Sequence, residues 1–207
     1  MSHMDKINIL FPGSFKPFTG AHIYQITEYL KDKRINNIIV IIGTGERCGI
    51  NQDMSYSIAL KLFNNHRIKI IKSKPFILQD GKKIYSPIIS SGQYIEHDAE
   101  PGIYSMIAST KNNDYDRVKE FYDYFTIKAP QKLSIGIKVF MPPKTIEPLL
   151  YVGRSDNYNN TPISASILRK DILNNDRKNF ETNYPYSSEE IKYFIWDYLE
   201  KIIRWKK

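Results

Sequence analysis

The sequence between residues 11 and 22, FPGSFKPFTGAH, joins a short apolar run to a stretch with helical spacing. The apolar run, Ile7–Phe11, is rich in strand-forming residues and closes at Pro12 and Gly13, which predicts a buried strand followed by a turn. Apolar residues recur three and four positions apart within His22–Lys33, which predicts a helix. The quoted stretch is therefore expected to be the loop between a first strand and a first helix.

Strand and helix patterns alternate along the rest of the chain. Five β-branched residues in a row at Ile38–Ile42 are typical of a parallel strand that is buried on both faces. Asp53 is expected to cap the helix that follows this strand. Alternation of this kind predicts an α/β fold, a Rossmann-like three-layer sandwich with a mostly parallel five-stranded sheet. The strands are expected at Ile7–Phe11, Ile38–Ile42, Ile68–Ile71, Ile103–Ala108 and Ile135–Phe140.

The composition is that of one globular domain, which we expect to span residues 5–207. The chain has 207 residues, of which 42% are hydrophobic and 25% are charged. Residues 1–4 read Met-Ser-His-Met, which is typical of an expression scar. The single cysteine, Cys48, excludes an intramolecular disulfide and favours a cytoplasmic location. No apolar run approaches the ~20 residues needed to cross a bilayer, so no membrane partner is expected.

The formal net charge of +8 favours anionic partners. Nucleotides, phosphate esters and nucleic acids all fit this charge, and so does an ordinary solvated surface without a charged partner. The chain has no run of five or more basic residues, so the signature of an arginine-rich RNA-binding arm is absent.

The loop after the first strand has the parts needed to hold a triphosphate. Gly13 allows the backbone to approach a ligand closely. His22 stands at the start of a helix, where amide groups and the helix dipole favour anions. Thr19 can donate its hydroxyl from the same turn, and Lys16 can add positive charge.

This loop resembles a known signature. Its pattern G-S-F-x-P-x-T-x-x-H resembles the H/T-x-G-H motif of the nucleotidyltransferase superfamily, which includes nicotinamide mononucleotide and phosphopantetheine adenylyltransferases and cytidylyltransferase-like phage proteins. The resemblance implies that Thr19 and His22 bind the triphosphate and the transition state, assisted by Lys16. Ala21 stands where the signature usually has glycine. The resemblance also implies nucleotide contacts at Gly13, Ser14 and Phe15.

A second motif occurs about 140 residues later along the chain. Residues 163–169 read ISASILR and resemble the I-S-x-[ST]-x-[ILV]-R motif of the same superfamily. The stretch predicts a helix N-terminus with two hydroxyls in its first turn, and Arg169 shares a helix face with Ser166. Together with Ser164, these groups are expected to bind the β- and γ-phosphates of a nucleotide.

The resemblance implies a direct transfer reaction. The acceptor phosphate attacks the α-phosphorus of a nucleoside triphosphate and pyrophosphate leaves, without a covalent enzyme intermediate. We expect Mg²⁺ as the cofactor, bridging phosphate oxygens. No residues have metal-ligand spacing, so no metal-binding residue is predicted. By family analogy, Arg47 is a candidate contact of the acceptor phosphate, with a simple surface arginine as the alternative, and Asp114 is a candidate ribose contact.

Two details of the resemblance favour ATP over CTP. Cytidylyltransferases usually have His at the position of Thr19, and they usually carry R-T-x-G before the second motif, where this chain has Asn-Asn-Thr-Pro at residues 159–162. Adenylyl transfer to nicotinamide or nicotinate mononucleotide is therefore the first hypothesis. Cytidylyl transfer to a sugar or polyol phosphate is the alternative.

Two other functions remain to be compared with these. The first is a non-catalytic nucleic-acid-binding protein on the same fold, which the basic charge and 15 tyrosines would allow but which lacks an RNA-binding module signature. The second is a fragment related to class I aminoacyl-tRNA synthetases, which is disfavoured because no K-M-S-K-S-like loop is present. The expected partners are thus a nucleoside triphosphate and a small phosphate-bearing acceptor, and a homo-oligomer is compatible with the resemblance.

Overall fold

The structure, a computed structural model of the chain, describes residues 6–110 and 114–205. Residues 1–4, the expected expression scar, lie outside the described residues. The described chain forms two compact units, each assembled from several segments of the sequence. The first unit comprises the chain up to Gly13, Glu28–Thr44 and Asn65–Glu147, and the second comprises Ser14–Thr27, Gly45–Asn64 and Pro148–Lys207. The expectation of one domain over residues 5–207 stays a prediction.

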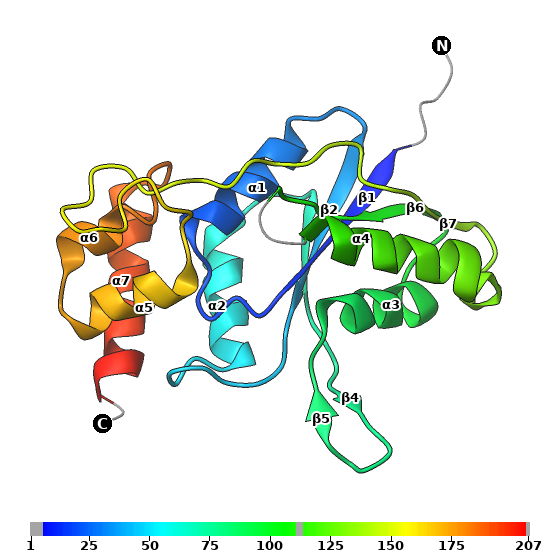
Figure 1. Cartoon of the computed structure of the whole chain (residues 1–207), viewed down its shortest axis with the longest axis horizontal. Helices are drawn as coiled ribbons and strands as arrows, with labels where there is room; N and C mark the ends of the chain where they lie inside the picture. The colour runs from blue at the N-terminus through cyan, green and yellow to red at the C-terminus, as the bar shows by residue number, and fades with distance from the viewer. Residues whose placement is uncertain (1–5, 111–113, 206–207) are drawn as a thin grey trace. The chain divides into compact units, whose positions relative to one another are not determined.

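The first unit is built on a five-stranded sheet with the strand order β3-β2-β1-β6-β7. All four strand pairings in this sheet are parallel. The Rossmann-like α/β class with a parallel five-stranded sheet is therefore confirmed (Figure 1). The strands are β1 (Ile7–Gly13), β2 (Ile35–Ile42), β3 (Ile68–Lys72), β6 (Gly102–Met106) and β7 (Ile137–Val139).

The strand order places a topological switch point between β1 and β6. From β1 the chain adds β2 and β3 on one side, and it then returns to add β6 and β7 on the other side. Open parallel sheets bind ligands beyond the carboxyl ends of their strands at such a point. The loop that begins at Ser14 follows β1 directly, so it leaves the sheet at the carboxyl end of this strand.

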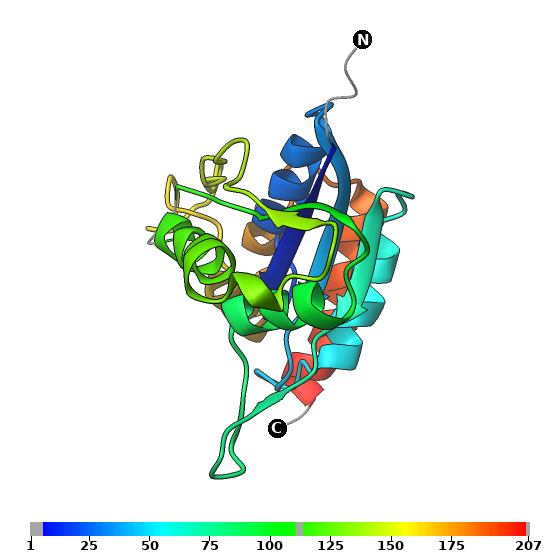
Figure 2. The same cartoon turned by 90° about the vertical axis from the view of Figure 1, so that its right-hand side faces the viewer.

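Two helices, α3 (Pro87–His97) and α4 (Asp114–Asp123), pack on one face of this sheet. They lie side by side in both ribbon views (Figures 1 and 2). A π-helix at Tyr124–Lys128 continues α4, and a short 3₁₀ helix follows at Pro130–Lys132. The core beneath them contains Leu10 and Ile39 from the sheet and Phe121 from α4, all buried.

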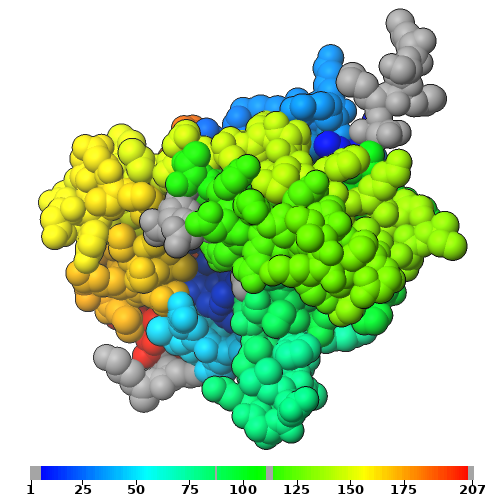
Figure 3. Space-filling model, turned by 45° about the vertical axis from the view of Figure 1, so that its right-hand side comes forward, coloured from blue at the N-terminus to red at the C-terminus, as the bar shows by residue number. Residues whose placement is uncertain are grey.

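A small hairpin interrupts the chain between β3 and α3. Its two strands, β4 (Phe76–Ile77) and β5 (Lys83–Ile84), pair antiparallel with each other, and they protrude from the surface of the first unit (Figure 3). The residue that follows, Tyr85, lays its ring on Gly43, where an added Cβ would lie 2.6 Å from the ring. A side chain at position 43 would therefore displace Tyr85.

The second unit is helical. It contains most of α1 (Gly20–Leu30), whose last residues belong to the first unit. The other helices of this unit are α2 (Gln52–Leu62), α5 (Ala165–Leu173), α6 (Arg177–Glu181) and α7 (Glu189–Trp205). Helices α5, α6 and α7 pack on one another, with Phe180 and Trp196 in edge contact at 4.9 Å between ring centroids.

Some element boundaries differ from the expectation. Asn51 caps α2, because its side chain accepts a hydrogen bond from the Met54 amide at 2.9 Å, whereas Asp53 lies inside the first turn. The strand expected at Ile135–Phe140 is shortened to β7, because Gly136 has a φ of 85° that interrupts the extended backbone. Among the described residues, no helix is both long and apolar enough to cross a membrane.

Candidate active site

The loop between β1 and α1 is held in place by hydrogen bonds to its carbonyl groups. The Ser55 hydroxyl donates to the Phe15 carbonyl at 2.8 Å, and the Tyr184 hydroxyl donates to the Phe18 carbonyl at 2.6 Å. The Phe15 and Phe18 rings are buried and stack at 4.1 Å between centroids. The loop also contains a cis peptide bond at Lys16-Pro17. Each of these contacts lies within the second unit, so the loop has one defined conformation there.

His22 is oriented by Thr19, three residues before it. The Thr19 amide donates to His22 Nδ1 at 2.9 Å, and Thr19 Oγ1 lies 3.1 Å from the same nitrogen. Because Nδ1 accepts a hydrogen bond from a main-chain amide, the neutral ring carries its hydrogen on Nε2. Phe15 meets the imidazole edge to face at 5.0 Å between centroids. His22 is thus a half-buried donor whose ring orientation is set on both sides.

The start of α1 requires a residue without a side chain at position 20. A Cβ on Gly20 would lie 1.9 Å from the Asn183 carbonyl oxygen, which no side chain can accommodate. Ala21, which stands where the family signature has glycine, is half-buried. The position that needs glycine in this chain is therefore residue 20, one residue before Ala21.

Lys16 is buried, with 3% of its surface exposed. Its ammonium donates to the Ser14 carbonyl at 3.1 Å. Burial lowers the pKa of Lys16 from 10.5 to about 8, because the charged form loses hydration. An anion bound beside the ammonium would favour the charged form.

The second motif contacts the first through Arg169, whose guanidinium donates to the Lys16 carbonyl. Burial lowers the pKa of Arg169, the electrostatic interaction with Cys48 raises it, and the nearby positive charge of Arg47 lowers it. Lys16, Arg47 and Arg169 therefore gather positive charge in one part of the second unit. A cluster of this kind is suited to a polyanionic ligand.

The two serines of the second motif lie at the N-terminus of α5. Ser164 is the N-cap, and its hydroxyl accepts a hydrogen bond from the Ile167 amide at 3.4 Å. The hydroxyls of Ser164 and Ser166 are 3.0 Å apart. The first amides of a helix have no partner within the helix and attract anions. These hydroxyls and amides belong to the helix that carries Arg169.

A buried polar network connects the start of α5 with the segment that packs against the first motif. Arg154 forms two hydrogen bonds with the Asp171 carboxylate, at 2.9 and 2.7 Å. Asn183 donates to Asp171 at 3.1 Å and accepts from the Tyr151 hydroxyl at 2.7 Å. The Tyr151 hydroxyl in turn accepts from the Ser164 amide at 3.3 Å. This chain of contacts fixes the start of α5 relative to the Asn183 backbone, on which Gly20 packs.

Two predicted site residues belong to the first unit. Gly13 ends β1, and its carbonyl accepts a hydrogen bond from the Gly43 amide at 2.8 Å. Asp114 opens α4, accepts from the Ser109 hydroxyl at 2.5 Å and forms an ion pair with Arg117. The predicted ribose contact at Asp114 remains a prediction.

Sequence reasoning missed three residues of this site, Cys48, Tyr151 and Asn183. Arg47 and Ile50 pair across a tight turn in which Cys48 and Gly49 both have positive φ, and this turn places Cys48 beside Arg169. No local motif marks Tyr151 or Asn183, because their roles depend on contacts between distant segments.

Comparisons with known proteins agree with this fold. The chain resembles a bifunctional NMN adenylyltransferase/ADP ribose pyrophosphatase from Francisella tularensis, with a TM-score of 0.50 and 13% identity over 97% of this chain and 53% of that chain. It thus spans about half the length of that protein. The likeness agrees with the fold expected from the resemblance to the nucleotidyltransferase superfamily, and at this identity it shows the fold alone.

Two further structures are less similar, with TM-scores below 0.5. One is the Francisella tularensis bifunctional protein complexed with AMP and a manganese ion, with a TM-score of 0.42 and 13% identity over 98% of this chain and 55% of that chain. The other is Plasmodium falciparum nicotinic acid mononucleotide adenylyltransferase complexed with APC, with a TM-score of 0.36 and 17% identity over 93% and 98% of the two chains. No protein-family model and no curated protein sequence matches the chain.

Proposed function

We propose that this protein is a nucleotidyltransferase that moves AMP from ATP to a phosphate-bearing acceptor and releases pyrophosphate. The observation that carries the proposal is the pair formed by Thr19 and His22, in which a main-chain amide holds Nδ1 at 2.9 Å and leaves Nε2 as the donor. A histidine fixed in this way can donate to a phosphate oxygen without rearranging during the reaction.

The reaction in this proposal is an in-line displacement at the α-phosphorus. An oxygen of the acceptor phosphate forms the new bond, and the bond to the bridging oxygen of pyrophosphate breaks. His22 Nε2 donates to an oxygen that gains charge in the transition state. Lys16 contributes its positive charge beside the same loop. Catalysis then consists of positioning the reactants and stabilising charge, without a covalent enzyme intermediate.

The β- and γ-phosphates would be held by the second motif. Ser164 and Ser166 supply hydroxyls at the N-terminus of α5, and Arg169 supplies a guanidinium from the same helix. The contact of Arg169 with the Lys16 carbonyl supports this assignment, because it ties the phosphate-binding helix to the loop that carries His22.

Mg²⁺ is the metal that we propose for this reaction. Among the described residues, no group of three or more His, Cys, Asp or Glu side chains could hold a metal ion. We therefore propose that Mg²⁺ is bound mainly by phosphate oxygens and water, a coordination that this ion commonly adopts. When bound, the ion would neutralise part of the triphosphate charge.

The acceptor that we propose is nicotinamide or nicotinate mononucleotide. Arg47 is exposed and lies close enough to Arg169 to influence its pKa, so it can meet the acceptor phosphate near the triphosphate. The fold neighbour from Francisella tularensis is an NMN adenylyltransferase in one of its two activities, which supports the choice of this acceptor for the first test.

Pyrophosphate release tests the proposal. The protein is incubated with Mg²⁺, each nucleoside triphosphate in turn and a panel of acceptors: nicotinamide mononucleotide, nicotinate mononucleotide, phosphopantetheine, glycerol phosphate and several sugar phosphates. We expect release with ATP and a pyridine mononucleotide, and the ³²P of α-labelled ATP should appear in a dinucleotide product. Release with CTP and a sugar or polyol phosphate would instead assign cytidylyl transfer.

The His22→Ala substitution supplies the decisive control. Loss of one transition-state donor commonly lowers kcat by about 10²–10³-fold, and we expect a decrease of this size. The matched control is His97→Ala, since His97 is exposed at the end of α3 and lies in the other unit. A His22→Ala variant with unchanged kcat would contradict the assignment of His22.

A further inference from the structure

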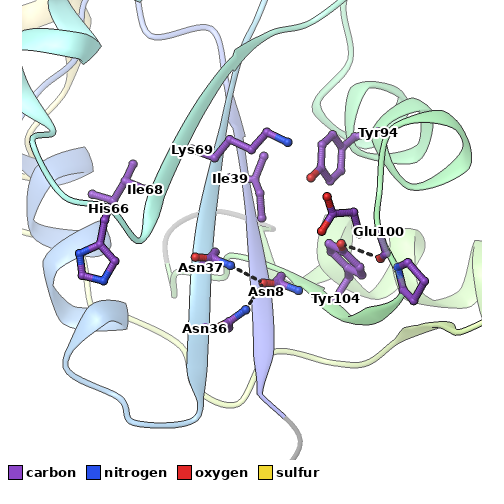
Figure 4. A pocket seen from close by; sticks show the side chains of 11 residues that line it. Asn8, Asn36, Asn37, Ile39, His66, Ile68, Lys69, Tyr94, Glu100 and Tyr104 are labelled. Carbon is purple, nitrogen blue, oxygen red and sulfur yellow. Dashed lines mark hydrogen bonds between the residues drawn. The ribbon is translucent and has the colours of Figure 1, made fainter.

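The first unit contains a pocket at the amino-terminal edge of its sheet, where the strands begin. The pocket has a volume of about 500 Å³ and is lined by the first residues of several strands and by the end of α3 (Figure 4). Nucleotides of such sheets bind at the opposite edge, beyond the carboxyl ends of the strands. This pocket therefore does not belong to the loop and helix N-termini described above.

The pocket lies beside the last turn of α3, which is shorter than the longest strand of the sheet. Its 11 residues extend over roughly 16 Å at 1.5 Å per residue. The eight residues of β2 extend over roughly 26 Å at 3.3 Å per residue. Tyr94, in the last turn of α3, lines the pocket together with residues near the starts of the strands.

Three of the strand residues that line the pocket are asparagines. Asn8 of β1 and Asn36 and Asn37 of β2 line the pocket. Asparagine is disfavoured in strands, so three of them at one place are not explained by strand formation. The register between the two strands shifts here, with Ile7 opposite Ile35 but Ile9 opposite Ile38. The shift places two residues of β2 opposite one residue of β1.

This bulge gathers the three side-chain amides into one cluster. Asn8 Oδ1 accepts hydrogen bonds from Asn36 Nδ2 and Asn37 Nδ2, both at 3.2 Å. Within the described part of the chain, Asn8 Nδ2 and the Oδ1 atoms of Asn36 and Asn37 have no further hydrogen-bond partner. The cluster therefore presents amide N–H donors and carbonyl acceptors next to one another, which suits the edge of a nucleobase.

The far side of the pocket carries aromatic and charged groups. The Lys69 ammonium lies 5.7 Å from the centre of the Tyr94 ring, and Figure 4 shows that the Lys69 side chain extends toward this ring. The Tyr104 hydroxyl donates to the Glu100 main-chain carbonyl at 2.9 Å, so the Glu100 carboxylate is not used in this bond. Glu100 also lines the pocket. A carboxylate in such a place can accept hydrogen bonds from the hydroxyls of a ribose.

A second hollow of about 420 Å³ adjoins this pocket and shares Asn36, Asn37 and His66 with it. Its remaining charged residues are all basic: Lys6, Lys33 and Arg67. Arg67 directs its guanidinium to the carbonyls of Asn36, Leu30 and Ile35 rather than to a carboxylate. Its positive charge therefore favours an anion in this hollow.

We propose that the two hollows together form a second binding site, which takes a nucleoside monophosphate. The phosphate lies at the basic end beside Lys6, Lys33 and Arg67. The base meets the asparagine cluster, and the ribose lies toward Glu100. Pockets of this size accommodate a ligand of one nucleotide rather than a length of strand. The site is independent of the proposed transfer reaction, since none of its residues belongs to the first or second motif.

Titration with AMP, followed by ¹H–¹⁵N NMR of the full chain, tests the proposal. The side-chain amide signals of Asn8, Asn36 and Asn37 report on the pocket directly, so binding at the transfer site is observed separately. We expect these signals to shift and saturate with AMP in the protein and in its His22→Ala variant alike. Absence of any shift of the three amides at millimolar AMP would overturn the proposal.

Charge variants identify where the phosphate binds. The double substitution Lys6→Ala/Lys33→Ala removes two exposed charges and is expected to weaken AMP binding about tenfold. The matched control is Lys82→Ala/Lys83→Ala, which removes the same charge from the exposed β4–β5 hairpin and should leave the affinity within about twofold. Equal weakening by both pairs would overturn the proposed phosphate position.

Three other probes define the class of ligand. Adenosine and inorganic phosphate should each bind at least about tenfold more weakly than AMP, because each makes only part of the contacts. Phosphate that shifts the same signals with the affinity of AMP would reduce the site to an unspecific anion site. An oligonucleotide that binds these residues more tightly than AMP would assign a nucleic-acid surface instead, and either result would overturn the proposal.

Discussion

Replacing Lys16 by methionine should stabilise the protein while weakening the binding of ATP. Lys16 is buried, and its pKa is lowered from 10.5 to about 8. A lowering of this size corresponds to about 3.4 kcal/mol of folding free energy that the charged side chain costs at pH 7. Methionine is apolar and similar in length, so the substitution removes this cost without creating a large cavity.

The expected net gain is smaller than this figure. The Ser14 carbonyl accepts a hydrogen bond from the ammonium at 3.1 Å, and loss of this donor costs about 1 kcal/mol. We therefore expect Lys16→Met to raise the free energy of unfolding by about 2 kcal/mol at pH 7. The Kd for ATP should rise at least about tenfold, because the loop loses its buried positive charge.

The gain should depend on pH in a defined direction. The folded pKa of Lys16, about 8, lies below the unfolded value of 10.5, so the unfolded chain binds more protons between these values. The cost is fully present below pH 8 and disappears as the pH rises toward 10.5. At about pH 9.5 the cost falls to about 1.4 kcal/mol, and the net gain of the variant should nearly vanish.

Urea unfolding followed by tryptophan fluorescence measures these free energies at both pH values. Lys178→Met serves as the matched control, because Lys178 is exposed on α6 in the same unit, and it should change stability by less than about 0.5 kcal/mol. A Lys16→Met variant that is less stable than the parent at pH 7 would refute the reasoning. A gain that does not decrease with pH would refute it equally, because it would show that the cost is not due to the charge.

Two further predictions concern the packing around the site. Gly20→Ala should destabilise the protein by about 1–3 kcal/mol, because its Cβ would overlap the Asn183 carbonyl. The matched control, Ala21→Gly, should cost about 1 kcal/mol or less through its lower helix propensity. Equal losses of stability in the two variants, measured by thermal unfolding, would contradict the close approach at Gly20. Tyr151→Phe removes the hydroxyl that contacts both Asn183 and the Ser164 amide, so it should lower the free energy of unfolding by about 1–3 kcal/mol. It should also raise KM for ATP more than it lowers kcat. An unchanged stability in urea titration would show that the network does not support α5.

The sheet of the first unit could be predicted from local sequence patterns, whereas α3 and the β4–β5 hairpin could not. The run of β-branched residues at Ile38–Ile42 lies within β2 and is buried. Such a run is typical of a parallel strand that is covered on both faces, which is why it could be predicted. Helix α3 was not expected, since two serines and a glycine at residues 90–92 lower its helix propensity. Its start was nevertheless marked by Ser86, which caps the helix, and by Pro87 in its first turn. The two-residue strands of the β4–β5 hairpin are too short for any periodicity to appear.

Part of the candidate site could likewise be predicted from the sequence, and part of it could not. Thr19 and His22 could be paired from the sequence, because three residues at a helix start bring their side chains together. Arg169 could be assigned to the same ligand only through the resemblance, and its contact with the Lys16 carbonyl now supplies a physical reason. Asn183 and Tyr184 gave no signal, since their contacts with the first motif, at Gly20 and Phe18, lie more than 160 residues earlier in the chain. Interactions of this kind depend on the whole fold rather than on neighbouring residues.

The distribution of the second unit over three separate segments has a consequence for biosynthesis. The loop at Ser14–Thr19 is translated long before the residues that donate to its Lys16 and Phe18 carbonyls, Arg169 and Tyr184. Contacts between such distant residues form slowly, and they cannot form before the later segment has been translated. Between the synthesis of the first motif and that of Tyr184, the nascent chain therefore carries this motif without the contacts that hold its loop in place.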